Sequence, residues 1–218
     1  MNLQELIAAY RDESDDNEEP PLCTDERLTR FANEGQVEAC RRALVLTDST
    51  SALCTISYAA DDATITLDPR ILEVRSASIG NEEVRLRTVE QVSCSWPNWR
   101  TDTLRNVPSF LLRGLDSGKL HLYPRPAASG TIQLAVFRLP LMPLVNDEDV
   151  PELRLEWHQS LVDWMLYRAY SRRDSEQLDP KIAGEALARF EAEFGTRTGA
   201  RNEDWSRNSS VSSPPPIA

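Results

Sequence analysis

Few residues of this 218-residue chain have the types and the spacing that catalysis or metal binding requires. Only two histidines are present, His121 and His158, which is too few for most histidine-based metal centres. Asp163 follows His158 by five residues, and that spacing does not align two side chains on a helix. We therefore expect His158 to be a hydrogen-bonded core or interface residue rather than a catalytic base.

The common catalytic and cofactor-binding motifs are also missing from the sequence. It contains no Gly-x-Gly-x-x-Gly, Walker loop, His-Glu-x-x-His or Gly-x-Ser-x-Gly, and only eight glycines. The acidic groups at residues 61–62, 82–83 and 147–149 lack the ligand spacing of a calcium loop, so we interpret them as solvated turns. A hydrolase with two converging carboxylates has no supporting motif either. We predict no catalytic, cofactor-binding or metal-binding residues, and no enzyme.

Tryptophans are the residues with the clearest potential for binding. Trp96 and Trp99 flank Pro97 in a predicted loop, and such a pair can clamp a sugar or a base. The pair can equally fill the junction between a β domain and a helical bundle, or lie at a subunit interface. Trp157 and Trp164 are seven residues apart on one predicted helix and lie off its inward stripe, which favours burial against a second surface.

The last segment, residues 196–218, has no hydrophobic periodicity and ends in SSVSSPPPIA. Trp205 and Ile217 are its isolated large apolar residues, and Arg201 and Arg207 flank the tryptophan. Trp and Arg are favoured anchors at protein interfaces, so this composition is typical of a flexible segment that orders on a partner. The alternative is a disordered tail without a partner.

The chain is acidic, with 24 Lys and Arg against 35 Asp and Glu and a net charge of −11. A nucleic-acid-binding surface needs clustered positive charge, so the composition argues against a protein that binds DNA or RNA over its whole surface. The densest acidic patch, residues 11–21, predicts a mobile linker after a short helix at residues 2–10. We recognise no signal peptide or membrane span, and the four cysteines lack disulfide or metal-binding spacing, which predicts reduced thiols in a cytosol.

Hydrophobic spacing predicts where the helices and strands lie. A spacing of three and four predicts helices over about residues 25–45, 151–172 and 180–194, and a period of two over residues 53–138 predicts six or seven antiparallel strands without helices between them. Gly35, inside the first of these helices, indicates a close helix crossing or a break. The predicted fold class is therefore α+β, a helical bundle from the N- and C-terminal helices with an inserted antiparallel β domain.

This interpretation divides the chain into four regions. They are a short helix and acidic linker at residues 1–24, a helical bundle at residues 25–50 and 150–195, an inserted β domain at residues 51–145, and a flexible C-terminal tail at residues 196–218.

Several sequence blocks, in order along the chain, resemble the head-to-tail adaptor family of tailed bacteriophages, also called connector or neck proteins. The blocks span about residues 25–195 and are LDPRILEVRS, SWPNWR followed by PSFLL, KLHLYPRPAASGTIQLAVFRLPLMPL, VPELRLEWHQSLVDWMLYRAYSRRD and DPKIAGEALARFEAEFG. The resemblance implies a structural protein of the virion neck, assembled in the host cytoplasm, with no cofactor and no membrane. It implies a ring, usually of twelve copies, beneath the portal protein, with a tail tube or nozzle protein below it and double-stranded DNA as transiting cargo.

Three groups of residues are expected to serve such a role. The family's C-terminal segments commonly reach the portal, and the matching candidates here are Arg201, Trp205, Arg207 and Ile217. The candidates for subunit interfaces are Trp96, Trp99, Trp157 and Trp164. The candidates for lining the channel are Asp147, Glu148 and Asp149, because acidic walls let DNA slide without binding its phosphates. The alternative function is a carbohydrate-binding β module on a helical scaffold, with Trp96 and Trp99 as its binding residues.

Overall fold

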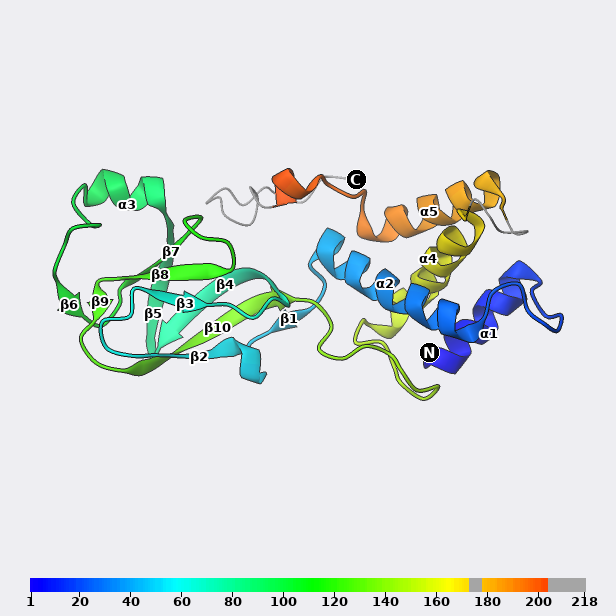
Figure 1. Ribbon diagram of the computed structural model, residues 1–218, viewed down its shortest axis with the longest axis horizontal. Coiled ribbons are helices and arrows are strands. Elements are labelled where there is room, and N and C mark those ends of the chain that lie inside the picture. Colours follow the sequence, from blue (N-terminus) through cyan, green and yellow to red (C-terminus); the bar gives the residue numbers. More distant parts are fainter. Residues whose placement is uncertain (173–177, 204–218) are drawn as a thin grey trace. The chain divides into compact units, whose positions relative to one another are not determined.

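The computed structural model describes residues 1–172 and 178–203, and its fold is α+β as predicted (Figure 1). The chain divides into two compact units. The first, which we call the helical unit, contains Met1–Leu46 and Leu139–Arg197. The second, the β unit, contains Thr47–Arg138 together with the segment that begins at Thr198.

The helical unit is built from four α-helices with well-defined ends. They are α1 (Leu3–Ser14), α2 (Asp25–Ala43), α4 (His158–Tyr170, preceded by the 3-10 turn Leu155–Trp157) and α5 (Pro180–Phe194). A capping box between Asn2 and Glu5 begins α1. Asp179 begins α5, because its side chain accepts hydrogen bonds from the backbone of Lys181 and Ile182. The predicted limits of this last helix are confirmed.

Helices α2 and α4 cross closely at Gly35. A Cβ atom at this position would lie 3.1 Å from Cδ1 of Trp164 and 3.2 Å from Cδ2 of Leu161. The glycine therefore marks a close crossing and not a break in α2, which continues to Ala43. The largest fully buried side chains of the helical unit are Tyr10, Phe31, Phe190, Leu3, Leu6, Leu28, Leu161 and Met165.

The expectation of a mobile linker over residues 11–21 was wrong in its first part, because α1 extends into this segment. Arg11 donates hydrogen bonds to the carbonyl oxygens of Asp16 and Cys23. The buried carboxylate of Asp16 accepts the backbone N–H groups of Leu22 at 2.8 Å and Cys23 at 2.9 Å. The sequence pattern suggested that the acidic groups of this segment repel each other. Instead, Arg11 and the backbone N–H groups stabilise the charge of Asp16.

The β unit contains ten short strands and the α-helix α3 (Val89–Ser95), and its described residues 200–203 are also helical. The strands are β1 (Thr47–Asp48), β2 (Thr55–Tyr58), β3 (Thr64–Thr66), β4 (Ile71–Ile79), β5 (Glu82–Thr88), β6 (Arg105–Asn106), β7 (Phe110–Arg113), β8 (Lys119–Tyr123), β9 (Arg125–Pro126) and β10 (Gly130–Arg138). Eight of them form a sheet of order β1-β10-β4-β5-β7-β8-β3, in which β2 also pairs with β10. The remaining two, β6 and β9, pair with each other.

The predicted purely antiparallel sheet requires one correction. Strands β5 and β7 pair in parallel, with Leu86 opposite Leu111, and β6 and β9 are also parallel. A parallel pair cannot be joined by a tight hairpin, and the connection from β5 to β7 contains α3. A capping box between Thr88 and Gln91 begins this seven-residue helix, which is too short to give a clear periodic signal.

The alternation of apolar residues along the strands is confirmed by burial. The inward-facing side chains share one core, whose members include Ile65, Val84, Leu120, Leu122, Ile132, Leu134 and Val136. These residues come from β3, β5, β8 and β10, so strands far apart in the sheet order contribute to the same core. The sheet is therefore curved around this core.

Candidate functional site

The described part of the chain does not assemble side chains around a metal site. No group of three or more His, Cys, Asp or Glu side chains there is placed to bind a metal. His158 is buried, and its Nε2 lies 2.9 Å from the carbonyl oxygen of Leu153, which confirms it as a hydrogen-bonded core residue. His121 pairs through Nε2 with Asp116 at 2.7 Å. All four cysteines are free thiols, as their spacing predicted.

None of the helices within the described residues has both the length and the apolar character to cross a membrane.

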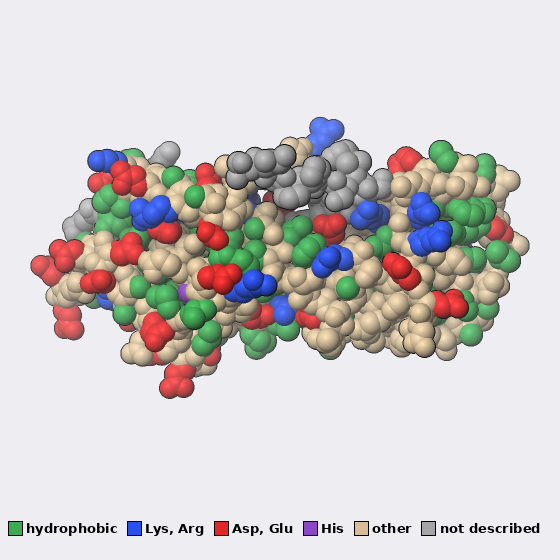
Figure 2. Space-filling model, turned by 180° about the vertical axis from the view of Figure 1, so that it is seen from behind, with side chains coloured by type: hydrophobic (Ala, Val, Ile, Leu, Met, Phe, Trp, Pro, Cys, Tyr) green, Lys and Arg blue, Asp and Glu red, His purple; other side chains and the backbone are tan. Residues whose placement is uncertain are grey.

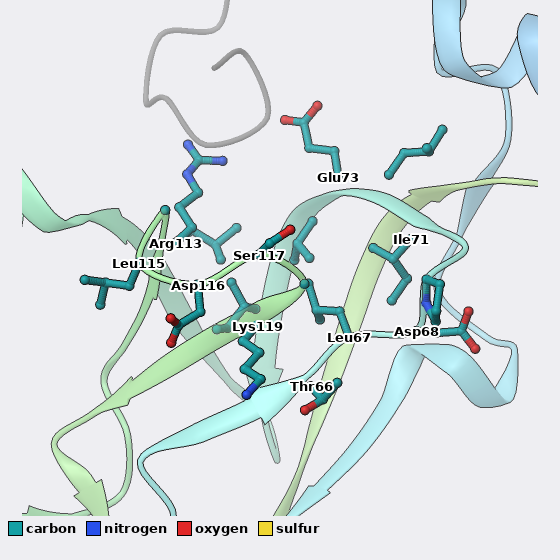
Figure 3. A pocket seen from close by; sticks show the side chains of 17 residues that line it. Thr66, Leu67, Asp68, Ile71, Glu73, Arg113, Leu115, Asp116, Ser117 and Lys119 are labelled. Atoms are coloured by element: carbon teal, nitrogen blue, oxygen red, sulfur yellow. The ribbon is translucent and has the colours of Figure 1, made fainter. Parts of the chain in front are cut away.

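A cavity of about 590 Å³ opens in the β unit, between the segment that joins β3 to β4 and the β7–β8 hairpin (Figure 3). Leu67, Leu72 and Leu86 give it an apolar lining. Asp68, on its rim, binds the guanidinium group of Arg70, and this hydrogen bond lowers the pKa of the carboxyl to about 2. Asp116, also on the rim, pairs with His121. The carboxylates of Asp68 and Asp116 therefore both have partners close to them in the chain.

An aromatic cluster lies beside α3 in the β unit. The ring of Trp96 is 5.1 Å from Phe110, and Trp99 meets Tyr123 edge to face at 6.5 Å. The guanidinium group of Arg100 lies 4.5 Å from the centre of the Trp99 ring, so it occupies one face of that ring. Trp96 is 44% exposed, and it is the tryptophan that this cluster presents to solvent.

Trp157 and Trp164, the two tryptophans of the helix predicted over residues 151–172, have different environments. Trp157 is partly buried beside Phe194, with ring centres 6.2 Å apart. Trp164 is only 5% exposed and packs against Phe190 at 4.8 Å, so placing it off the inward face was wrong. A single inward stripe was expected for this helix, whereas α4 contacts α1, α2 and α5 and therefore buries most of its circumference.

The burial of α4 extends to a charged pair. Asp163 is 7% exposed, and its carboxylate accepts a hydrogen bond from Nε of Arg189 at 2.5 Å. Burial raises the pKa of Asp163, while the hydrogen bond and the charge of Arg189 act in the opposite direction. This pair links α4 to α5 inside the helical unit and has a structural role.

The three acidic residues proposed to line a channel belong to the segment Leu139–Arg154, which we call the 139–154 loop. The carbonyl oxygens of Asp147 and Asp149 accept the backbone N–H groups of residues 4 and 3, which attaches the loop to the start of α1. The carboxylate of Asp149 accepts two further backbone N–H groups of its own loop, and these hydrogen bonds lower its pKa. The side chains of Asp147 and Glu148 are exposed to solvent.

Polar side chains of α2 hold the same loop at two further points. Asn33 accepts the backbone N–H of Leu144 at 2.8 Å and donates to its carbonyl oxygen at 2.9 Å. The buried side chain of Gln36 accepts the backbone N–H of Glu152 at 3.2 Å. The loop is thus fixed in place although it contains no helix or strand.

This fixed loop and the turn that follows it expose several large apolar side chains, which the sequence analysis did not select. They are Met142 (73% exposed), Val145 (69%), Val150 and Leu155. Two signals in the sequence pointed to them, namely the proline-interrupted apolar run LPLMPLV and the acidic residues directly after it. Apolar residues of this size in a rigid, solvent-facing loop are typical of a protein-binding surface.

A second cavity, of about 410 Å³, lies in the helical unit along α2 and α4. Val37, Trp164 and Tyr167 contribute apolar surface, and Arg30 and Arg197 are the most exposed of the basic residues that line it. The indole Nε1 of Trp164 is buried and has no hydrogen-bond acceptor within the described residues. A buried donor without an acceptor costs about 1–3 kcal/mol.

The charged side chains of both units are mixed in sign on the face shown in Figure 2, where the described Lys and Arg side chains are interspersed with Asp and Glu. That face therefore lacks the continuous positive surface that DNA binding requires.

Of the four residues proposed to bind the portal, Arg201 is exposed in the structure. The other three, Trp205, Arg207 and Ile217, lie outside the described residues.

Comparison with known proteins identifies one family. The sequence profile of the SU10 adaptor protein family matches residues 1–214, which is nearly the whole chain. No curated protein matches the sequence.

Proposed function

Because the chain belongs to the SU10 adaptor protein family, we propose that it is a structural head-to-tail adaptor of a tailed bacteriophage. In this role it forms a ring beneath the portal, extends the DNA channel and docks the tail during virion assembly and genome ejection. The single observation that carries the proposal is the family match over residues 1–214. The ring is located in the virion neck and assembles in the host cytoplasm.

The exposed apolar side chains support a protein with several protein partners. The helical unit exposes Met142, Val145, Val150 and Leu155, and the β unit exposes Trp96, Leu104 and Val107. Exposed apolar groups that gather in fixed segments are typical of surfaces that other proteins cover. A structural role is also consistent with the charged residues described above, whose partners belong to the same unit of the chain.

We propose three contacts for the ring. The C-terminal segment with Arg201, Trp205, Arg207 and Ile217 binds the portal, and a tail tube or nozzle protein docks on the opposite side. Trp96, Trp99 and Trp157 lie at subunit interfaces, whereas Trp164 has little exposed surface left to contribute. The acidic residues at 147–149 were expected to face the channel, but we propose instead that the exposed side chains of Asp147 and Glu148 contact a neighbouring subunit.

The test is assembly of the purified protein with the portal protein of the same phage. Sedimentation and negative-stain images are expected to show a portal with an added ring of this chain, at about twelve copies per portal. The protein alone is expected to be monomeric, so the portal-containing sample decides the question. Persistent failure to form a portal-dependent ring would refute the proposed function.

A further inference from the structure

Two features of the helical unit complement each other in shape and charge. One is the tip of the 139–154 loop, which exposes Met142 and Val145 beside the acidic side chains of Asp147 and Glu148. The other is the cavity of about 410 Å³ along α2 and α4, which has apolar side chains, three arginines, and the two glutamates Glu34 and Glu38 in its lining. A protruding apolar and acidic segment and a recessed apolar and basic site are what a heterologous contact between identical subunits requires.

The loop tip cannot turn its apolar side chains inward. Asn33 and Gln36 hold its backbone from α2, and the carboxylate of Asp149 binds the backbone of residues 145 and 146. Because the loop is already fixed, docking it costs little conformational entropy. The exposed apolar groups are therefore available to a partner without rearrangement of the chain.

The charges around the cavity leave two arginines available. Glu34 forms a close ion pair with Arg168 at 2.7 Å, so those two charges largely compensate each other. Arg30 and Arg197 are 62% and 57% exposed, and their nearest carboxylate oxygens lie at 4.0 Å. Each can therefore reach an acidic group of another molecule.

We propose that the 139–154 loop of one subunit inserts into the α2–α4 cavity of its neighbour in the ring, an inference that rests on the proposed function. Met142 and Val145 then cover the apolar lining at Val37 and Tyr167. Asp147 and Glu148 pair with Arg30 and Arg197.

The positions of the two features within the helical unit favour contact between different subunits. The loop adjoins the cavity of its own subunit, because Asn33 lines the cavity and also binds Leu144 of the loop. No residue of the loop lines the cavity within the described part of the chain, so the loop of the same subunit leaves it open. Each subunit can therefore accept the loop of a neighbour.

The contact is small, because one loop tip covers much less than the roughly 800 Å² per partner of a stable interface. A pair of free subunits is therefore expected to separate. On a portal, where neighbours are held side by side, the same contact becomes effectively intramolecular and forms at high occupancy.

Charge reversal with rescue tests this pairing in assemblies of the full chain with portal protein. The loop variant is Asp147→Arg with Glu148→Arg, the cavity variant is Arg30→Glu with Arg197→Glu, and the combined variant contains all four changes. Each two-residue variant is expected to lower ring occupancy on the portal about tenfold, because like charges then face each other. The combined variant is expected to recover to within about threefold of the unaltered protein. Glu82→Arg with Glu83→Arg changes two exposed residues of β5 by the same net charge as the loop variant and is expected to assemble normally.

Cross-linking provides a second readout that does not depend on charge. Val145→Cys and Val37→Cys are introduced together with Cys94→Ser, since the other three native thiols are buried. A short bismaleimide is expected to give a ladder of covalent oligomers from assembled rings, and no ladder when Leu178→Cys replaces Val37→Cys.

The outcomes separate the two proposals. Normal assembly of the loop or cavity variant, no recovery in the combined variant, or rings without a ladder would overturn the loop–cavity pairing and leave the adaptor role intact. Failure of the unaltered protein to assemble on the portal would overturn the adaptor role and this inference with it.

Discussion

Replacing Gly35 with alanine tests the close crossing of α2 and α4, on which the helical unit depends. The new Cβ would lie 3.1 Å and 3.3 Å from two carbon atoms of Trp164 and 3.2 Å from Cδ2 of Leu161. Gly184, in α5, is the matched control because a Cβ added there meets no atom within 4 Å. Both substitutions place alanine in an α-helix of the same unit.

The two substitutions share one favourable contribution and differ in one unfavourable contribution. Alanine in place of glycine stabilises a helix by about 1 kcal/mol, and this gain applies to both sites. Overpacking a filled core costs about 1–3 kcal/mol, and this cost applies only at Gly35. We therefore expect Gly184→Ala to raise the free energy of unfolding by about 0.5–1 kcal/mol, and Gly35→Ala to lower it by about 1 kcal/mol.

Urea titration monitored by far-UV circular dichroism measures the free energy of unfolding of both variants. An unchanged slope with denaturant shows that the same transition is compared. The expected difference between the variants is about 1.5–2 kcal/mol. Equal stability of Gly35→Ala and Gly184→Ala would refute the close crossing.

Three further predictions concern the β unit and the tail. Burial opposes ionisation of Asp48, but hydrogen bonds from Ser51, Thr50 and Arg138 outweigh it and hold the pKa well below its ordinary value. Its contribution to stability is therefore full above about pH 4 and is lost as the pH falls below that. Unfolding titrations should show that Asp48→Asn is less stable than the unaltered protein by about 1–3 kcal/mol at pH 7, and that this difference shrinks in acid. A difference in stability that stays constant with pH would contradict the lowered pKa of Asp48. Gly130→Ala would place a Cβ 2.4 Å from the hydroxyl oxygen of Tyr58. The substitution should lower the free energy of unfolding by about 2 kcal/mol or more, and with it the thermal midpoint by several degrees. An unchanged midpoint would exclude that contact. Deletion of residues 200–218 should leave the circular dichroism spectrum unchanged and weaken portal attachment; unchanged incorporation into particles would refute the tail contact.

The elements predicted well are those in which a single face is buried. The limits of α5 follow from Asp179 and Pro180 at its start and Gly195 after its end, which are local signals. The strand residues that alternate, such as Ile132 and Leu134, are buried because one face of the sheet covers a core. Such patterns depend on the chain near each residue, so a sequence suffices to identify them.

The elements predicted poorly depend on partners that are distant in the sequence. Trp164 is buried because α4 is surrounded by three helices, and no local pattern states how many neighbours a helix has. The parallel pairing of β5 and β7 depends on α3, whose capping box at Thr88 and Gln91 was the only local signal. The order of the 139–154 loop depends on Asn33, more than a hundred residues earlier in the chain.

The candidate site residues also divide into those that the sequence identified and those that it did not. Trp96 was selected because it flanks Pro97 together with Trp99 in a predicted loop, and its exposure is consistent with a binding role. The apolar loop residues Met142 and Val145 were overlooked, since a short apolar run without periodicity predicts burial as readily as exposure. Only the hydrogen bonds that fix the loop reveal that these side chains remain in solvent.

The most direct test of the adaptor role is a cryo-electron microscopy reconstruction of the neck of the phage particle that contains this protein. Our account predicts a ring of this chain between the portal and the tail, with both units of each subunit recognisable in the density. A neck in which the portal contacts the tail directly, with this chain located elsewhere in the particle or absent from it, would contradict the account.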